Sequence, residues 1–147
     1  MHVLIFATSL EGGIVVFDQN DRAVAFKQTA EPISVQLVDL DFDKRPEIIT
    51  DELAGRGTGL LHRVYHIYQL ASDGRILDLW KGDSVFYSPT EQPRWGYLKV
   101  DRAQATHPGY SVEHVVMDEQ AGRTTSEILQ VVNGVVRSLA KTVRPLK

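Results

Sequence analysis

The chain has 147 residues, 43% of them apolar and 24% charged, which is ordinary for a globular protein with one domain. Its 16 basic and 19 acidic residues leave a net charge of −3, and neither sign forms a long block. The sequence therefore lacks the electrostatic pattern of a protein that binds nucleic acid or anionic membranes. The absence of cysteine excludes disulfides and thiolate metal sites, but leaves the compartment open.

The N-terminal region predicts a strand at His2–Thr8. Its apolar run is too short for the apolar region of a secretory signal, and no basic residues precede it. If the protein is exported, we expect Met1 to be a start placed after a removed signal. No run in the chain approaches the ~20 apolar residues of a membrane helix.

Short β-rich runs recur along the chain between turn residues, and one hairpin pattern occurs three times. The pairs of runs are Ile14–Phe17 with Ala23–Phe26 around Asp18–Asp21, Val64–Tyr68 with Ile76–Leu79 around Asp73-Gly74, and Ile128–Val131 with Val135–Leu139 around Asn133-Gly134. Asp-Gly and Asn-Gly are strong hairpin signals, because both turn residues tolerate positive φ. The sequence therefore predicts an all-β domain of antiparallel hairpins.

The hairpins recur at roughly 50 to 60 residues, close to the length of a propeller blade. Further strands are expected before the later hairpins, at Ser34–Val38, Glu47–Asp51, Gly96–Val100 and Ser111–Met117. Residues 1–147 are predicted to form a single, small, distorted three-bladed propeller-like domain, or pinwheel, with blade units at about 1–31, 32–82 and 94–141. Thr142–Leu146 is expected to supply a missing strand to the first blade. A sandwich of packed hairpins and half of a six-bladed ring made by two subunits are alternatives.

Acidic residues gather before the strand that starts at Glu47. Asp39, Asp41 and Asp43 occupy alternate positions, and Glu47 adds a fourth carboxylate. With the carbonyl of Arg45 they make a set of hard oxygen donors of the kind that Ca²⁺ binds in short loops. The alternative is a tight, solvated turn in which the aspartates accept hydrogen bonds from nearby backbone amides without a metal.

This segment resembles the Asp-rich turn of FG-GAP/VCBS repeats, the blade units of integrin-like and bacterial secreted β-propellers. The resemblance implies a propeller-like fold, an exported protein and one structural Ca²⁺. It departs from the family at Phe42 and Lys44, where the family has glycine. The corresponding segment of the third unit, Val100–Tyr110, keeps only Asp101, so a second ion is not expected.

Other candidates for chemistry are weaker. His62 and His66 are four residues apart, which on a strand is ~13 Å and too far for one ion. His107 and His114 have no evident partner. Gly55–Gly59 lacks the lysine and the helix of a phosphate loop, so we interpret it as a flexible connection whose Arg56 and Thr58 are candidates for partner contacts.

Val85–Trp95 is interpreted as a connection between two blades, and it carries three aromatic residues, two prolines and an arginine. Tyrosine, tryptophan and arginine dominate interface energies, and proline lowers the entropy lost on ordering a loop. We therefore predict partner contacts at Tyr87, Ser88 and Arg94. For Phe86 and Trp95, core packing and partner contact are both open.

The sequence shows no nucleophile with a base and no open metal site, so we predict a non-catalytic protein-binding domain rather than an enzyme. Its expected location is periplasmic or secreted, with the cytoplasm left open. One alternative is a periplasmic inhibitor or immunity protein that blocks a cell-wall hydrolase by loop insertion. Another is a small hydrolase with an unrecognised site.

Overall fold

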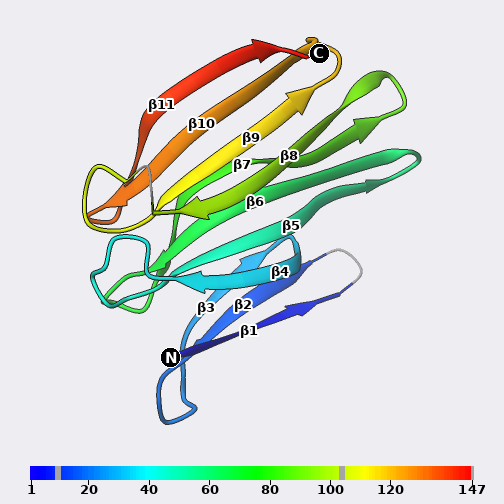
Figure 1. Ribbon diagram of the computed structural model, residues 1–147. Helices are drawn as coiled ribbons and strands as arrows, with labels where there is room; N and C mark the ends of the chain where they lie inside the picture. The colour runs from blue at the N-terminus through cyan, green and yellow to red at the C-terminus, as the bar shows by residue number, and fades with distance from the viewer. Residues whose placement is uncertain (9–10, 103–104, 147) are drawn as a thin grey trace.

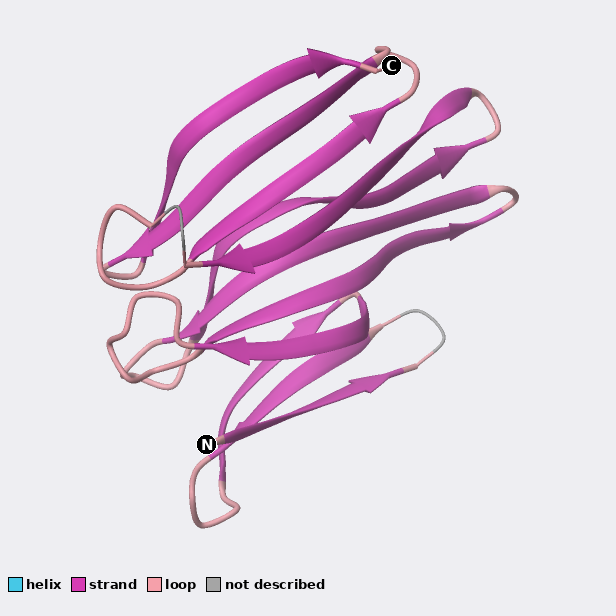
Figure 2. Ribbon diagram, in the orientation of Figure 1, coloured by secondary structure: helices cyan, strands magenta, loops and turns pink. Residues whose placement is uncertain are grey.

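The computed structural model describes residues 1–8, 11–102 and 105–146, and these residues form strands, turns and loops without any helix (Figures 1 and 2). The predicted all-β, antiparallel class is confirmed. No described segment is a helix long and apolar enough to span a bilayer. The strands are β1 His2–Ala7, β2 Gly12–Phe17, β3 Ala23–Thr29, β4 Glu31–Val38, β5 Glu47–Gly57, β6 Leu60–Leu70, β7 Ile76–Ser88, β8 Glu91–Asp101, β9 Ser111–Asp118, β10 Arg123–Val132 and β11 Val135–Pro145.

The strands make two sheets. One is three-stranded, in the order β1-β2-β3, and the other is eight-stranded, running from β4 to β11 in chain order. Figure 1 shows the three-stranded sheet at one end and β11 at the other. The three predicted hairpins are present as β2–β3, β6–β7 and β10–β11. In the last of them Asn133 and Gly134 have φ values of 52° and 71°, as its turn chemistry requires.

Strand β5 is buried on both of its faces. Ile48 packs in one core cluster with Ile14 of β2, whereas Ile49 packs in a second cluster with Val112 of β9. Successive residues of a strand point to opposite faces. The β4–β7 part of the large sheet is therefore covered by β1–β3 on one face and by β8–β11 on the other, which gives three layers.

The large sheet folds over itself where β7 meets β8. These strands pair only near their hairpin, at Val85 with Trp95, Phe86 with Arg94, and Ser88 with Glu91. Beyond that point β8 crosses β7 so closely that a Cβ atom on Gly96 would lie 2.3 Å from the carbonyl oxygen of Asp83. Only glycine allows this approach, so Gly96 fixes where the third layer leaves the second.

Two predicted connections are strands instead. Val85–Trp95 is not a loop between blades: it is the β7–β8 hairpin, with only Pro89 and Thr90 at its tip. In Gly55–Gly59, residues up to Gly57 belong to β5, and the turn is Thr58 and Gly59. Proline and glycine usually favour loops. Here Pro89 lies in the turn itself and Pro93 lies in a sparsely paired stretch of β8, where a missing N–H costs little.

The expected pairing of the chain ends is also wrong. Thr142–Pro145 belongs to β11, whose partner in the sheet is β10, and β1 pairs with β2. The hairpin at Asn133-Gly134 pairs β11 with β10 from Val135 to Pro145, with one register shift between Ile128 and Leu129. The local pairing with β10 therefore occupies Thr142–Pro145, the segment that pairing with the first predicted blade would need.

We expect Gly96→Ala to lower the free energy of unfolding by about 2 kcal/mol, because the added methyl must displace a backbone carbonyl. The matched control is Gly55→Ala, where the added Cβ would meet nothing nearer than 3.6 Å and stability should be unchanged or slightly higher. Urea unfolding of both variants measures the difference. Equal losses would show that the crossing does not depend on Gly96.

Candidate functional site

The acidic turn lies between β4 and β5 and brings three carboxylates together. One oxygen each of Asp39, Asp41 and Asp43 lie within 4.8 Å of one another. Calcium binds oxygens at 2.3–2.6 Å, so two ligands of one ion are separated by up to ~5 Å. The spacing and the donor type both fit this ion. A shallow groove of about 220 Å³, lined by Asp41, Asp43 and His107, opens the turn to solvent.

The turn uses one oxygen of each aspartate for its own backbone. The Lys44 amide donates to Asp39 Oδ2 at 3.1 Å, the Asp43 amide to Asp41 Oδ1 at 3.3 Å, and the Arg45 amide to Asp43 Oδ1 at 2.8 Å. Asp39 Oδ1 is buried and has no hydrogen-bond partner. Burial, followed by the negative charges of Asp43 and Asp39, raises the pKa of Asp41. A bound cation would offset two costs: the burial of Asp39 Oδ1 without a partner, and the repulsion between the Asp41 carboxylate and its acidic neighbours.

Two residues of the turn, Phe42 and Lys44, adopt a backbone conformation that glycine favours. Phe42 and Lys44 have φ values of 60° and 71°. The Phe42 ring packs edge-on against Tyr110 at 5.3 Å between centroids, and the Arg102 guanidinium lies 5.2 Å from its centre. These contacts, with the hydrogen bond from the Lys44 amide, offset strain of about 1 kcal/mol or more per residue. The side chains at 42 and 44 therefore do not prevent the turn's backbone conformation.

At the other two predicted positions the side chains have structural contacts of their own; the carbonyl of Arg45, the ligand predicted there, stays a prediction. The Arg45 side chain donates to Asp43 Oδ2 at 2.8 Å, so its guanidinium already neutralises part of the acidic charge. Glu47 is fully buried and accepts hydrogen bonds from the Leu40 amide at 2.8 Å and from Gln69 Nε2 at 3.2 Å. Its carboxylate holds the turn from the core side and is not part of the three-aspartate group. Burial raises the pKa of Glu47 to about 7.

A second loop supports the acidic turn. The Tyr110 amide donates to the Leu40 carbonyl at 2.7 Å, and a Cβ atom on Gly109 would lie 2.2 Å from that same oxygen. This loop belongs to the third predicted unit, for which the sequence predicts no ion. Residues 103–104 lie outside the described structure. Asp101 of that unit pairs with Lys99 at 2.9 Å.

The predicted partner-contact residues come from two segments about 30 residues apart, and the structure joins them. Arg56 is paired with Leu61, and Leu61 with Tyr87, so the three share one row across β5, β6 and β7. Thr58 stands in the adjacent turn, and an added Cβ on neighbouring Gly59 would lie 2.9 Å from Pro89. The β5–β6 and β7–β8 tips therefore lie side by side. Ser88 is half-buried, and its hydroxyl lies 3.3 Å from that of Thr90.

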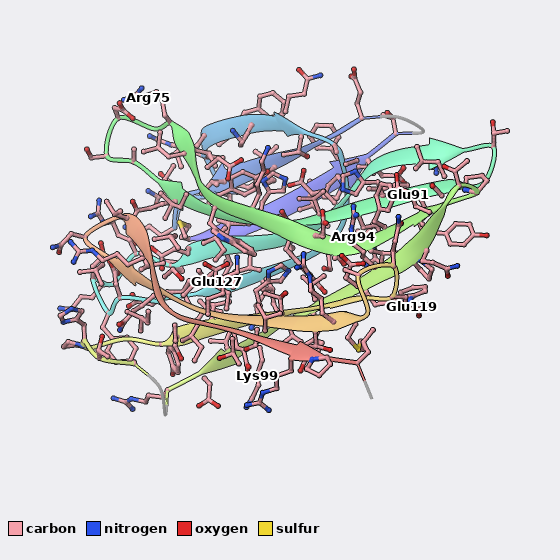
Figure 3. The ribbon with its side chains drawn as sticks, turned by 90° about the horizontal axis from the view of Figure 1, so that it is seen from above. Arg75, Glu91, Arg94, Lys99, Glu119 and Glu127 are labelled. Carbon is pink, nitrogen blue, oxygen red and sulfur yellow. The ribbon has the colours of Figure 1, made fainter. Side chains whose placement is uncertain are left out.

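Arg94 does not join that group. It pairs with Phe86, whose side chain points away from the face of Tyr87. The guanidinium Nε lies 3.4 Å from Asp83, Nη1 lies 3.7 Å from Glu91, and the group stacks 4.2 Å above the Phe86 ring. Figure 3 labels Arg94 and Glu91 on this hairpin. With 29% of its side chain exposed, Arg94 is placed to hold the hairpin together.

Three histidines have polar partners on β7, and two of them contact the same residue, Asp83. His62 pairs with Asp83 at 3.3 Å, His66 with Asp78 at 3.0 Å, and His114 Nε2 lies 2.8 Å from the Asp83 carbonyl. Among the described residues, no histidine is hydrogen-bonded to a serine, threonine or tyrosine hydroxyl.

Sequence reasoning missed the two further acids buried on β5. The Arg63 guanidinium and the Ser84 hydroxyl donate to Asp51, and Thr50 and Tyr68 donate to Glu52 at 2.7 and 2.8 Å. The available signal was the run of acids inside an otherwise apolar strand. Buried acids need such partners, so these groups have a structural role.

No family model matches the chain, and no curated protein or solved structure matches it either. The site is therefore interpreted from its own geometry.

The raised pKa of Glu47 predicts that stability falls as the pH rises. Below pH 4.5 the Glu47 carboxyl is protonated in both the folded and the unfolded state. Between pH 4.5 and about 7 it ionises only in the unfolded chain, so the free energy of unfolding falls by about 3 kcal/mol across this window. Glu47→Gln, which is neutral at every pH, should remove this part of the slope. Unfolding free energies measured in chelator from pH 4 to 8 give the comparison.

The control for this measurement is Glu119→Gln, an exposed acid in the β9–β10 turn, which should keep the wild-type slope. If Glu47→Gln and wild type show parallel pH profiles, Glu47 is already ionised in the folded protein near pH 5.

Proposed function

We propose that the chain is a non-catalytic protein-binding domain whose contact surface is the tip surface, defined as Arg56, Thr58 and Tyr87. The observation that carries the proposal is the meeting of the β5–β6 and β7–β8 hairpin tips. Tyr87 is 45% exposed at this position, in one row with Leu61 and Arg56. Exposed aromatic and arginine side chains held on paired strands are the usual anchors of protein interfaces.

The tip surface loses little entropy on binding. Tyr87 belongs to β7, and Arg56 belongs to β5, so both backbones are fixed by sheet hydrogen bonds before a partner arrives. Arg56 also forms an ion pair with Glu31 at 3.3 Å. Preordered contacts of this kind convert more of their interaction energy into affinity.

A calcium ion at Asp39, Asp41 and Asp43 is part of the proposal. The unpartnered Asp39 Oδ1 and the raised pKa of Asp41 support it, because both are relieved by a cation. The ion would hold the three aspartates of the turn together and take no part in chemistry. Sites of this type outside the cell bind at ~10⁻⁴–10⁻³ M, and this range fits the proposed periplasmic or secreted location.

The three layers support a blade interpretation of the fold. We assign the layers β1–β3, β4–β7 and β8–β11 to the predicted units at about 1–31, 32–82 and 94–141. Each layer is an antiparallel meander whose face packs on the next, as propeller blades do. The β7–β8 pairing joins the second and third units into one sheet, so the propeller-like arrangement is open and distorted.

Calcium should raise the melting temperature of the protein. At 5 mM calcium, a site of the expected affinity adds about 1 to 2 kcal/mol of stability, which is a shift of a few degrees for a chain of this size. Asp43→Ala and Asp41→Ala should abolish the shift, because each removes one of only three grouped carboxylates. Differential scanning calorimetry with calcium and with chelator measures it.

The matched control is Asp73→Ala. Asp73 binds the amide and Nε of Arg75 just as Asp43 binds those of Arg45, but it lies in a different turn. Asp73→Ala should therefore lose the same local hydrogen bonds and keep the calcium response. Identical melting curves of wild type with calcium and with chelator would leave the acidic turn a metal-free structure.

The tip surface is tested by a photo-crosslinking amino acid at position 87. In extracts of the native cells, we expect it to capture one discrete protein, while the same group at the exposed Arg137 on β11 should not. Thr58→Ala in the same molecule should reduce the yield without changing the melting temperature, since surface substitutions usually change stability by less than ~0.5 kcal/mol.

Equal capture from positions 87 and 137 would refute a specific contact at the tips. If the captured protein is a cell-wall hydrolase whose activity falls on binding, the inhibitor alternative is the correct form of the proposal. Arg94→Ala separates structure from binding, because it should lower the melting temperature by leaving Asp83 and Glu91 without their cation.

A further inference from the structure

The outer face of the third layer is a built, uncovered surface. Strand register places its residues in three rows across β8, β9, β10 and β11. The opposite face of the same strands carries Leu98, Val112 and Leu129 into the core. The outer rows are Trp95-Met117-Thr124-Arg144, Tyr97-Val115-Ser126-Thr142 and Lys99-Glu113-Ile128-Ala140. Trp95 lies on the same face of the β7–β8 hairpin as Tyr87, and the rest of this face extends from there across β9, β10 and β11.

A groove of about 340 Å³ runs across these rows. Its lining combines one aromatic ring, Tyr97, and two aliphatic side chains, Val115 and Ile128, with the hydroxyls of Thr124, Ser126 and Thr142, and with one acid and one base, Glu113 and Arg144. The groove volume is at the lower end of small-molecule sites and has room for roughly two sugar rings. Its formal charges cancel, so it offers no net attraction for an anion or a cation.

Much of the hydrogen-bonding capacity in this groove is unused. Within the described residues, the only side-chain hydrogen bond among the lining groups runs from the Ser126 hydroxyl to Glu113 Oε1, at 2.6 Å. That bond orients the Glu113 carboxylate. The groups that remain available to hydrogen-bond a ligand are Glu113 Oε2, both threonine hydroxyls and the Arg144 guanidinium. A ligand that carries many hydroxyl groups can use all of these at once.

Aromatic rings complete the pattern. Tyr97 is 47% exposed and Trp95 is 41% exposed, two positions apart on the same face of β8. Side chains at such positions stand ~6.6–6.8 Å apart along a strand, which is comparable to the length of one sugar unit. Rings of this kind offer a flat apolar surface beside a polar edge, and the C–H faces of sugars stack on it.

We infer that this groove binds a neutral oligosaccharide chain, with Tyr97 and Trp95 stacking on successive rings. Glu113, Thr142 and Arg144 bind the hydroxyl groups. A polypeptide partner is less favoured, because the groove is lined by hydroxyls and by balanced charges and has no deep apolar pocket for an anchor side chain. The inference goes beyond the tip surface and does not depend on it.

The test is affinity gel electrophoresis of the full chain in gels containing hydroxyethyl cellulose, xylan, galactomannan or mixed-linkage β-glucan. At least one polysaccharide should retard the wild-type protein, and its soluble oligosaccharide should change the tryptophan fluorescence. Tyr97→Ala should weaken binding by about tenfold or more. Thr142→Val, which keeps the side-chain shape, should weaken it by a smaller factor and covers the case in which Tyr97→Ala does not fold.

Tyr87→Ala is the matched control, because Tyr87 is a tyrosine of nearly equal exposure on the tip surface. It should leave polysaccharide binding unchanged, whereas it should abolish the protein contact proposed above, so the two proposals fail separately. Absence of retardation in all four gels would overturn the inference, as would equal losses in Tyr97→Ala and Tyr87→Ala. A concentration-dependent dimer in sedimentation that Tyr97→Ala abolishes would also overturn it, since a second copy would then cover the face.

Discussion

The burial of strand β5 on both faces is the constraint on which the rest of the structure depends. Its first six residues, Glu47 to Glu52, are all buried, and three of them are acids. Each acid is stabilised by neighbours from its own layer, β4–β7: Gln69 and the Leu40 amide at Glu47, Arg63 and Ser84 at Asp51, and Thr50 and Tyr68 at Glu52. Any shift in the register of β5 would leave a carboxylate in the core without its partners. These acids therefore fix the register of the strand.

Leu40 transmits that constraint to the acidic turn. Its side chain is fully buried in the core between the second and third layers. Its amide donates to Glu47 of β5, and its carbonyl accepts from Tyr110 beside β9. The residue between Asp39 and Asp41 is therefore fixed by two layers at once. The aspartates are presented on a rigid base, which is what a preorganised ion site requires.

The hairpins could be predicted because their information is local. Asp73-Gly74 and Asn133-Gly134 mark the turns and the pairing of the strands beside them, and the structure has both hairpins, with register shifts at bulges further along the strands. The crossing of β8 over β7 could not be predicted in this way. It depends on the close approach of Gly96 to Asp83, two residues that no local sequence pattern links. For the site, alternation predicted the meeting of the three aspartates. The inward turn of Glu47 depends on Gln69, which no local pattern reveals.

The two interpretations of the acidic turn, as an ion site and as a hydrogen-bonded turn, are compatible in the same geometry. Each aspartate gives one oxygen to a backbone amide, and these bonds fold Phe42 and Lys44 into left-handed backbone. The bonds hold the carboxylates near one another, although burial and then the like charges of Asp43 and Asp39 raise the pKa of Asp41. Arg45 offsets part of that repulsion from the solvent side, while Asp39 Oδ1 remains buried without a partner. The turn can therefore fold before an ion arrives, and binding would then relieve the remaining repulsion instead of creating the fold.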